Sequence, residues 1–206
     1  MFTKLITIPA TLLLLGFIGS SYGATCESTG NTDTPLSRFI INTDQGTAID
    51  RTTNLMWKRC IERMSGPQCT YSEGESSGSL GFNWSGAVLH AEQHEFAGKF
   101  DWRIPNVIEL MSIFDYQCYN SNGSKENHGI NYSVFPMDDL ADLALSIWTS
   151  SYPSDSEMNI NINYFSLPAS NFSGAKSRYR TELSNIRLVR EVTPNEFEPE
   201  LTLGGK

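Results

Sequence analysis

The chain has 206 residues and a formal net charge of −8 at pH 7, because 23 acidic residues outnumber 15 Lys and Arg. Such an acidic chain is repelled by nucleic acid and by anionic membranes, so neither is expected as a partner. Its length is sufficient for one domain with a substantial hydrophobic core.

Residues 1–23 have the pattern of a secretory signal peptide. Lys4 precedes an apolar run over residues 5–18, and residues 21–23 offer a small-x-small cleavage site. The run is too short for a membrane span, and no second long apolar run follows it. We therefore expect an exported protein, periplasmic, at the cell surface or secreted, whose mature chain has no membrane span.

Four cysteines follow the signal: Cys26, Cys60, Cys69 and Cys118. An even number in an exported chain predicts two disulfides, and four cysteines allow three pairings. We favour Cys60–Cys69, because residues 66–67 (Gly-Pro) can turn the chain between them, and this leaves Cys26–Cys118 as the second bridge. No CxxC pair occurs, so a cysteine-based zinc site is not expected.

After the signal, residues 24–37 are polar and predict a tether, and one domain is expected over residues 38–192. Short apolar or alternating segments predict strands at 38–41, 47–50, 55–60, 147–151, 159–165 and 185–190. Helices are expected from Asn83 to about Gly98 and over residues 107–115. Residues 61–82 and 119–133 predict loops, and residues 193–206 a flexible tail. Two main helices among short antiparallel strands indicate an α+β fold.

Residues 101–110 combine an extended entry with the start of a helix. Pro105 keeps the chain before it extended, and Asn106 can cap the helix that follows. Glu109 occupies the third helical position, where a capping box needs a carboxylate, and Arg103 is expected to pair with a nearby carboxylate or carbonyl. We therefore interpret this whole set as structural: Asp101, Trp102, Arg103, Pro105, Asn106 and Glu109.

Further motifs occur in a fixed order along the chain: DQGT at 44–47, LMW at 55–57, Trp84 with Ala87, DWRIPN at 101–106 with EL at 109–110, FP at 135–136 with WTSS at 148–151, and IRLVR at 186–190. Together they resemble the C-terminal domain family of the Legionella collagen-like adhesin over about residues 38–190. Two departures are visible. Asn54 stands where the family usually has glycine, which a left-handed turn tolerates, and Ile104 replaces a leucine.

The resemblance implies a fold similar to the C-type lectins and the formylglycine-generating enzymes. It also implies an exported adhesive or carbohydrate-binding module, because the best-studied adhesin domain of this family binds sulfated glycosaminoglycans as a trimer. A homo-oligomer is therefore compatible with the resemblance.

Basic residues gather near the C-terminus and could bind sulfate or an acidic glycan. Strand alternation places Arg187 and Arg190 on opposite faces, so the sequence does not establish a single patch. The ligand-binding candidates are Lys176, Arg178, Arg180 and Arg187. Indoles bury large areas, so core packing is favoured over a sugar-stacking platform for the four tryptophans Trp57, Trp84, Trp102 and Trp148.

His90 and His94 lie four apart on the first predicted helix and share one face. Two histidines in this arrangement can bind zinc only with a third ligand. The nearby carboxylates, Glu92 and Glu95, do not share that face well. We therefore interpret the pair as part of a solvated helix face.

Asp138, Asp139 and Asp142 offer oxygen ligands for calcium. Their segment is more typical of a helix N-terminus, where carboxylates interact favourably with the helix dipole. We expect no cofactor, with calcium as the alternative.

The sequence contains no serine nucleophile elbow, phosphate-binding loop or dinucleotide fingerprint. Cys60 and Cys69 fit a structural bridge better than the oxidising cysteine pair of the formylglycine-generating relatives. We therefore expect a non-catalytic exported module for adhesion or carbohydrate recognition, with an extracellular glycan or a surface protein as partner. The alternatives are an accessory subunit of a surface assembly that acts by protein contacts and, less favoured, a formylglycine-generating-like enzyme.

Overall fold

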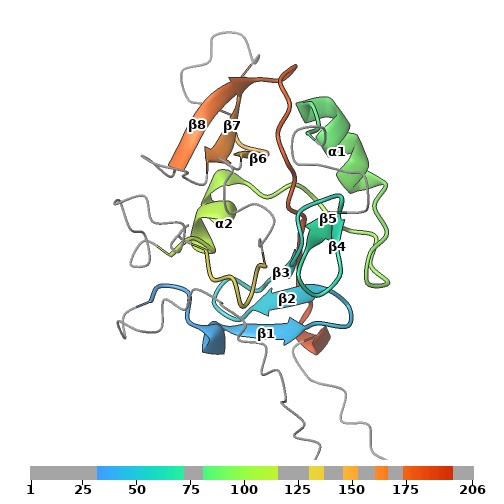
Figure 1. The fold of residues 1–206 in the computed structure, drawn as a ribbon, viewed down its shortest axis with the longest axis vertical. Helices are drawn as coiled ribbons and strands as arrows, with labels where there is room; N and C mark the ends of the chain where they lie inside the picture. Colours follow the sequence, from blue (N-terminus) through green and yellow to red (C-terminus); the bar gives the residue numbers. More distant parts are fainter. Residues whose placement is uncertain are drawn as a thin grey trace, which may run out of the picture.

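A computed structural model describes residues 32–71, 81–115, 130–136, 146–152, 161–166 and 174–196. The strands are β1 (Phe39–Asn42), β2 (Thr47–Asp50), β3 (Leu55–Lys58), β4 (Met64–Ser65), β5 (Thr70–Tyr71), β6 (Ser146–Trp148), β7 (Asn161–Ser166), β8 (Gly174–Tyr179) and β9 (Val189–Glu191). The helices are α1 (Trp84–Glu92) and α2 (Val107–Ser112), with 3-10 turns η2 (Leu36–Arg38) and η5 (Pro194–Glu196). The strands pair antiparallel in three sheets, ordered β1-β2-β3-β9, β4-β5 and β6-β7-β8 (Figure 1), so these residues form an α+β arrangement.

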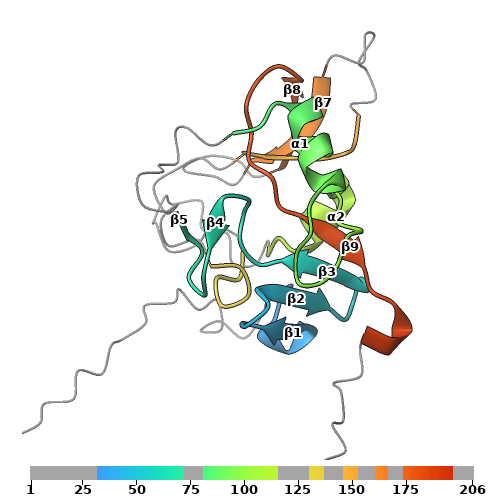
Figure 2. The same ribbon diagram turned by 90° about the vertical axis from the view of Figure 1, so that its right-hand side faces the viewer.

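The four-stranded sheet begins with the two predicted hairpins. Gly46 (φ 66°) closes the first turn and Asn54 (φ 57°) the second, so Asn54 adopts the left-handed conformation expected of a residue in a glycine position. β9 then pairs with β3, with Trp57 opposite Val189, so a strand from late in the sequence completes the sheet (Figure 2).

This sheet is buried on both faces. Successive side chains of a strand point to opposite sides, so neighbouring residues enter two different hydrophobic clusters. Trp57 joins one hydrophobic cluster with Leu110 and Phe135. Its neighbour Met56 joins a second cluster with Trp102, Trp148 and other apolar residues. Every residue of β2 and β3 is therefore buried, which differs from the half-buried pattern of a sheet with one wet face.

The disulfide Cys60–Cys69 is present, with a Cα–Cα distance of 5.0 Å, which confirms the predicted pairing. It closes the short β4–β5 hairpin, whose turn contains Gly66 at φ 77°. This hairpin lies in a segment that the sequence predicts as a loop. Cys26 and Cys118 lie outside the described residues, as does the predicted signal peptide.

Both ends of the predicted domain are more closely attached than expected. Thr32 and Thr34 at the end of the predicted tether donate to the carboxylate of Asp115, which follows α2. At the other end, Glu196 in η5 pairs with Lys99 and Arg190. These long-range polar contacts cannot be read from composition, which marks both segments as polar linkers.

Three elements differ from their predicted form. α1 ends at Glu92, and Gly98 instead lies in a tight turn with Ala97, both at positive φ. The strand predicted at 185–190 pairs with β3 only from Val189. The backbone of residues 185–188 instead forms single hydrogen bonds with several different segments. β8 was not expected, since its sequence is polar and lacks an apolar alternation.

No helix within the described ranges is both long and apolar enough to cross a membrane.

Candidate functional site

The 101–110 signature is a folding device, as predicted. Asn106 accepts a hydrogen bond from the backbone N–H of Glu109 at 2.9 Å, and Glu109 accepts one from the backbone N–H of Asn106 at 2.7 Å. The same carboxylate accepts two hydrogen bonds from Arg103, at 2.8 and 2.7 Å. Burial alone would raise the pKa of Glu109, but the bonds from Arg103 and Asn106 hold it below its ordinary value.

The first two residues of the signature are also structural. Trp102 is buried and donates its indole N–H to the carbonyl of Phe96 at 3.0 Å. Asp101 accepts a hydrogen bond at 2.7 Å from Arg190, which also bonds Glu196. Arg190 is therefore committed to two carboxylates, and it is buried.

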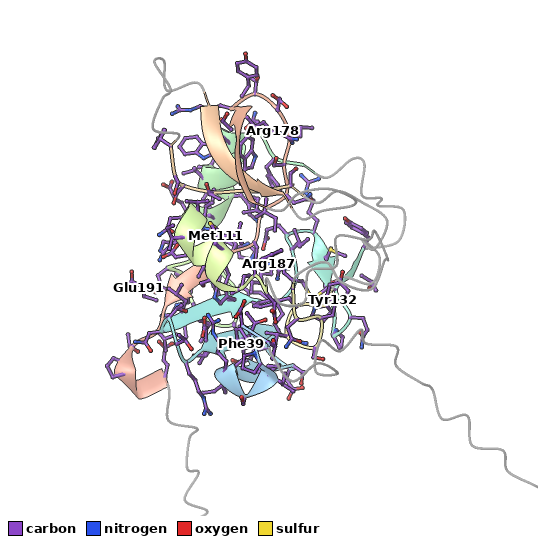
Figure 3. All side chains as sticks on the ribbon, turned by 90° about the vertical axis from the view of Figure 1, so that its left-hand side faces the viewer. Phe39, Met111, Tyr132, Arg178, Arg187 and Glu191 are labelled. Atoms are coloured by element: carbon purple, nitrogen blue, oxygen red, sulfur yellow. A yellow bond between two sulfur atoms is a disulfide. The ribbon has the colours of Figure 1, made fainter. Side chains whose placement is uncertain are left out.

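Arg187 does not belong to a ligand-binding surface, contrary to the expectation from the sequence. Its side chain is 0% exposed and lies in the interior, next to α2 and the four-stranded sheet (Figure 3). It donates to the backbone carbonyls of Lys58 and Arg59, and its guanidinium lies 4.8 Å from the ring centre of Phe135. Burial, with the nearby charge of Arg59, lowers the pKa of Arg187 to about 9.

Two other candidates are separated from Arg187 on the β7–β8 end of the molecule. Lys176 lies in β8 opposite Tyr164, and its side chain is outside the described part of the structure. Arg178 donates to the carbonyl of Leu183 at 2.8 Å and to the hydroxyl of Ser184 at 3.0 Å. Arg178 therefore holds the segment after β8 in place.

Arg180 lies over two aromatic rings, and we call Arg180, Trp84 and Tyr152 the cation–aromatic cluster. Its guanidinium carbon is 4.7 Å from the ring centre of Trp84 and 5.4 Å from that of Tyr152. The two rings are 6.1 Å apart, and Tyr152 is 49% exposed. Among the described residues, no carboxylate oxygen lies within 4.0 Å of Arg180. A half-buried cation and two aromatic rings, of which that of Tyr152 is exposed, thus meet at the start of α1.

Local structure fixes this cluster. The backbone N–H of Trp84 donates to the carbonyl of Arg180 at 3.0 Å, and its indole N–H donates to the carbonyl of Thr149 at 3.2 Å. Tyr152 follows the WTSS motif directly. The remaining tryptophans are buried, in agreement with core packing: Trp57, Trp102 and Trp148. Tyr152 was missed in the sequence because a single tyrosine in a polar segment carries no periodic signal.

His90 and His94 do not lie on a purely solvated face, because a carboxylate from a distant segment meets them. Glu62 Oε2 lies 2.7 Å from His90 Nε2 and 3.7 Å from His94 Nε2. Lys58 Nζ lies 2.7 Å from Glu62 Oε1 and 3.2 Å from His94 Nε2. We call Lys58, Glu62, His90 and His94 the histidine cluster. Its ligand atoms could hold a metal ion, whereas Glu92 and Glu95 are exposed.

Charge and burial set the protonation of this cluster. Burial lowers the pKa of His94, the charges of Lys58 and His90 lower it further, and the charge of Glu62 opposes them. For Glu62, burial alone would raise the pKa, but the bonds to His90 and Lys58 outweigh it and lower the pKa. Glu62 is therefore an anion next to a neutral His94 at pH 7.

A separate cavity of about 520 Å³ opens beside the N-terminus of α2. The residues that line it are Thr53, Asn54, Leu55, Asn106, Ile108, Glu109, Ser112, Glu191 and Val192. Ile108 is largely exposed at this cavity.

The calcium candidates Asp138, Asp139 and Asp142 lie outside the described residues, so the calcium alternative stays a prediction.

A model of the Lcl C-terminal domain family matches residues 46–192, well over half of the chain. This match confirms the family resemblance found in the sequence motifs. No curated protein and no solved structure matches the chain.

Proposed function

Since the chain belongs to the Lcl C-terminal domain family, we propose that it is an exported, non-catalytic binding module that recognises carbohydrate at the cell surface. We propose a C-type-lectin-like fold as its scaffold, supported by the α+β arrangement, the short antiparallel sheets and the disulfide. A disulfide is typical of an extracytoplasmic protein, which supports export.

The cation–aromatic cluster is the observation that carries this proposal. The apolar face of a sugar ring can pack on the exposed ring of Tyr152, as apolar groups do on aromatic faces. The guanidinium of Arg180 can donate two parallel hydrogen bonds to a sulfate or carboxylate group. Trp84 is held by two hydrogen bonds, so the cluster loses little freedom on binding. This chemistry favours an anionic glycan over a neutral one.

The acidic net charge of the chain works against an anionic ligand at long range, so the assignment rests on the local positive charge of Arg180. Charges beyond about 8 Å are largely screened at physiological ionic strength. Among the described residues, Glu182 follows Arg180 closely in the sequence, but its carboxylate is paired with Arg178, at 3.4 Å from Arg178 Nε.

The non-catalytic part of the proposal rests on the cysteines. Cys60 and Cys69 are both buried in the bridged hairpin, which supports a structural role over the redox site of a formylglycine-generating-like enzyme.

A glycan array, with and without calcium, followed by affinity measurement on the strongest ligand, tests the proposal. We expect Arg180→Ala and Tyr152→Ser each to weaken binding by about tenfold or more, as for a central contact residue. Arg51→Ala is the matched control, since Arg51 is exposed in the β2–β3 turn, and it should leave binding unchanged. Equal binding by Arg180→Ala and Arg51→Ala would overturn the assignment. A protein that binds no glycan but retains a specific cell-surface protein would instead support the accessory-subunit alternative.

A further inference from the structure

The histidine cluster has the geometry of a three-ligand metal site. His90 and His94 are one turn apart on α1, and their ring centres are 4.9 Å apart. Glu62 reaches them from the segment after β3, where its backbone N–H bonds the carbonyl of Ile186 at 3.0 Å. One nitrogen of each histidine and one oxygen of Glu62 all lie within 4.8 Å of one another.

These atoms are the ligands that zinc and similar ions prefer. Imidazole nitrogens and carboxylate oxygens bind zinc at about 2.0–2.2 Å, which places neighbouring ligand atoms about 3.3 Å apart in a tetrahedral site. The observed separations from Glu62 Oε2 to the two imidazole nitrogens, 2.7 and 3.7 Å, lie on either side of that value. The third separation, between the two imidazole nitrogens, is within 4.8 Å, so the side chains must rotate to bring all three ligand atoms around one ion.

The contact with Lys58 shows that this cluster already accepts a cation. An ammonium group has only donors, so His94 Nε2, at 3.2 Å from Lys58 Nζ, must accept with its lone pair. This is the tautomer that a metal ion requires at His94. His90 Nε2 instead donates to the Glu62 carboxylate at 2.7 Å, so it must lose that proton to ligate through this atom. Lys58 also lies 4.5 Å from the ring centre of Phe96, so it is held in place from another side.

Burial and exposure divide the cluster into a fixed ligand and an open side. The Glu62 side chain is 2% exposed, whereas those of His90 and His94 are 31% and 19% exposed. The rings of Phe82 and Phe96 flank the two histidines at 4.9 and 6.0 Å. An ion could therefore enter past the imidazoles and keep one coordination position toward solvent.

We infer that Glu62, His90 and His94 bind one divalent transition-metal ion of the zinc class. The ion replaces the ammonium of Lys58 at His94, while Lys58 retains its bond to the other oxygen of Glu62. The site lies on a different set of side chains from the proposed glycan-binding cluster and stands without it.

The test is titration of the untagged, chelator-stripped mature protein with Co²⁺, read by visible absorption, and with Zn²⁺, read by calorimetry. We expect a single saturable equivalent with the absorption of low-coordinate cobalt. His90→Gln and His94→Gln should each weaken binding by more than about tenfold, since each removes a ligand. His128→Gln, which changes the remaining histidine of the chain, and Glu92→Gln, on the same helix, are the controls and should bind like the wild type.

Lys58→Met tests the site in the opposite direction, because it should strengthen metal binding where the histidine substitutions weaken it. Removing the competing ammonium should tighten Zn²⁺ binding by at least about threefold, since like charges repel at this distance. It should also increase the rise in melting temperature that Zn²⁺ produces. The inference is overturned if the wild type shows no saturable binding, if His94→Gln binds as tightly as His128→Gln, or if Lys58→Met weakens binding. Glycan binding, measured on the metal-free protein, reports separately on the proposed function.

Discussion

Glu109→Ala is the substitution that tests the structural role of the 101–110 signature most directly. It removes half of the capping box at the start of α2, a loss of about 1 kcal/mol. It also removes both hydrogen bonds from Arg103, and bonds to charged groups contribute about 1.5–3 kcal/mol. The Arg103 side chain is 37% exposed, so solvent screening reduces that second contribution to about 1 kcal/mol. We therefore expect the free energy of unfolding to fall by about 2 kcal/mol.

Urea unfolding followed by tryptophan fluorescence measures this change. Asn106→Ala removes the cap but leaves the Arg103–Glu109 pair, so it should cost about 1 kcal/mol. A double-mutant cycle of Arg103→Met with Glu109→Ala should give a coupling of about 1 kcal/mol. The reasoning is refuted if Glu109→Ala and Asn106→Ala cost the same, or if the cycle shows no coupling.

The same carboxylate predicts a pH dependence. Burial alone would raise the pKa of Glu109, but its bonds from Arg103 and Asn106 lower it from the ordinary value of 4.5. A lowered pKa in the folded state means that the contribution is complete above the unfolded pKa and is lost as pH falls through the folded value. The stability difference between wild type and Glu109→Ala should therefore shrink below about pH 4. A difference that persists unchanged in acid contradicts the role of the charge.

Three further changes test other parts of the fold by the same unfolding assay. Asp50→Asn breaks the buried pair with Arg38 (2.5 Å) and should cost about 3 kcal/mol at pH 7. This cost should diminish in acid because the pKa of Asp50, which burial alone would raise, is lowered by its hydrogen bonds, chiefly from Arg38. Replacing Cys60 and Cys69 together by serine opens a loop of sequence separation 9 and should cost about 2.5 kcal/mol. Arg187→Ala empties a fully buried site and should cost about 3 kcal/mol, whereas a surface ligand-binding arginine would cost almost nothing.

Local features of the fold could be predicted because their causes lie within a few residues. Asn106 and Glu109 are three apart, so the capping box is visible in the sequence and present in the structure. Asn54 occupies its turn in the left-handed conformation that its position requires. The Cys60–Cys69 pairing followed from a turn between the two residues. In each case a short stretch of backbone determines the geometry.

The basic residues show where such reasoning ends. Alternation correctly indicates that Arg187 and Arg190 point in different directions, but it cannot show that both faces of their segment are covered. Arg187 is buried against the first hydrophobic cluster, and Arg190 is committed to Asp101 and Glu196. Arg180 stays available because it follows the last residue of β8 and meets two aromatic rings there. The availability of a basic residue to a ligand therefore depends on how distant segments of the chain pack over it, which a short sequence pattern does not show.

The histidine cluster gives the clearest physical reason for a missed site. Helical spacing predicts correctly that His90 and His94 share a face, but Glu62 is 28 residues from His90 in sequence. Glu62 reaches them because its own backbone bonds Ile186, and that contact forms only after the C-terminal segment has packed beside β3. One signal was present in the sequence. A carboxylate between Ile61 and the apolar Met64 predicts a buried charge, and a buried charge requires a partner. A search for that partner among all distant cations and histidines, rather than among neighbours on one helix face, is the step that leads to this cluster.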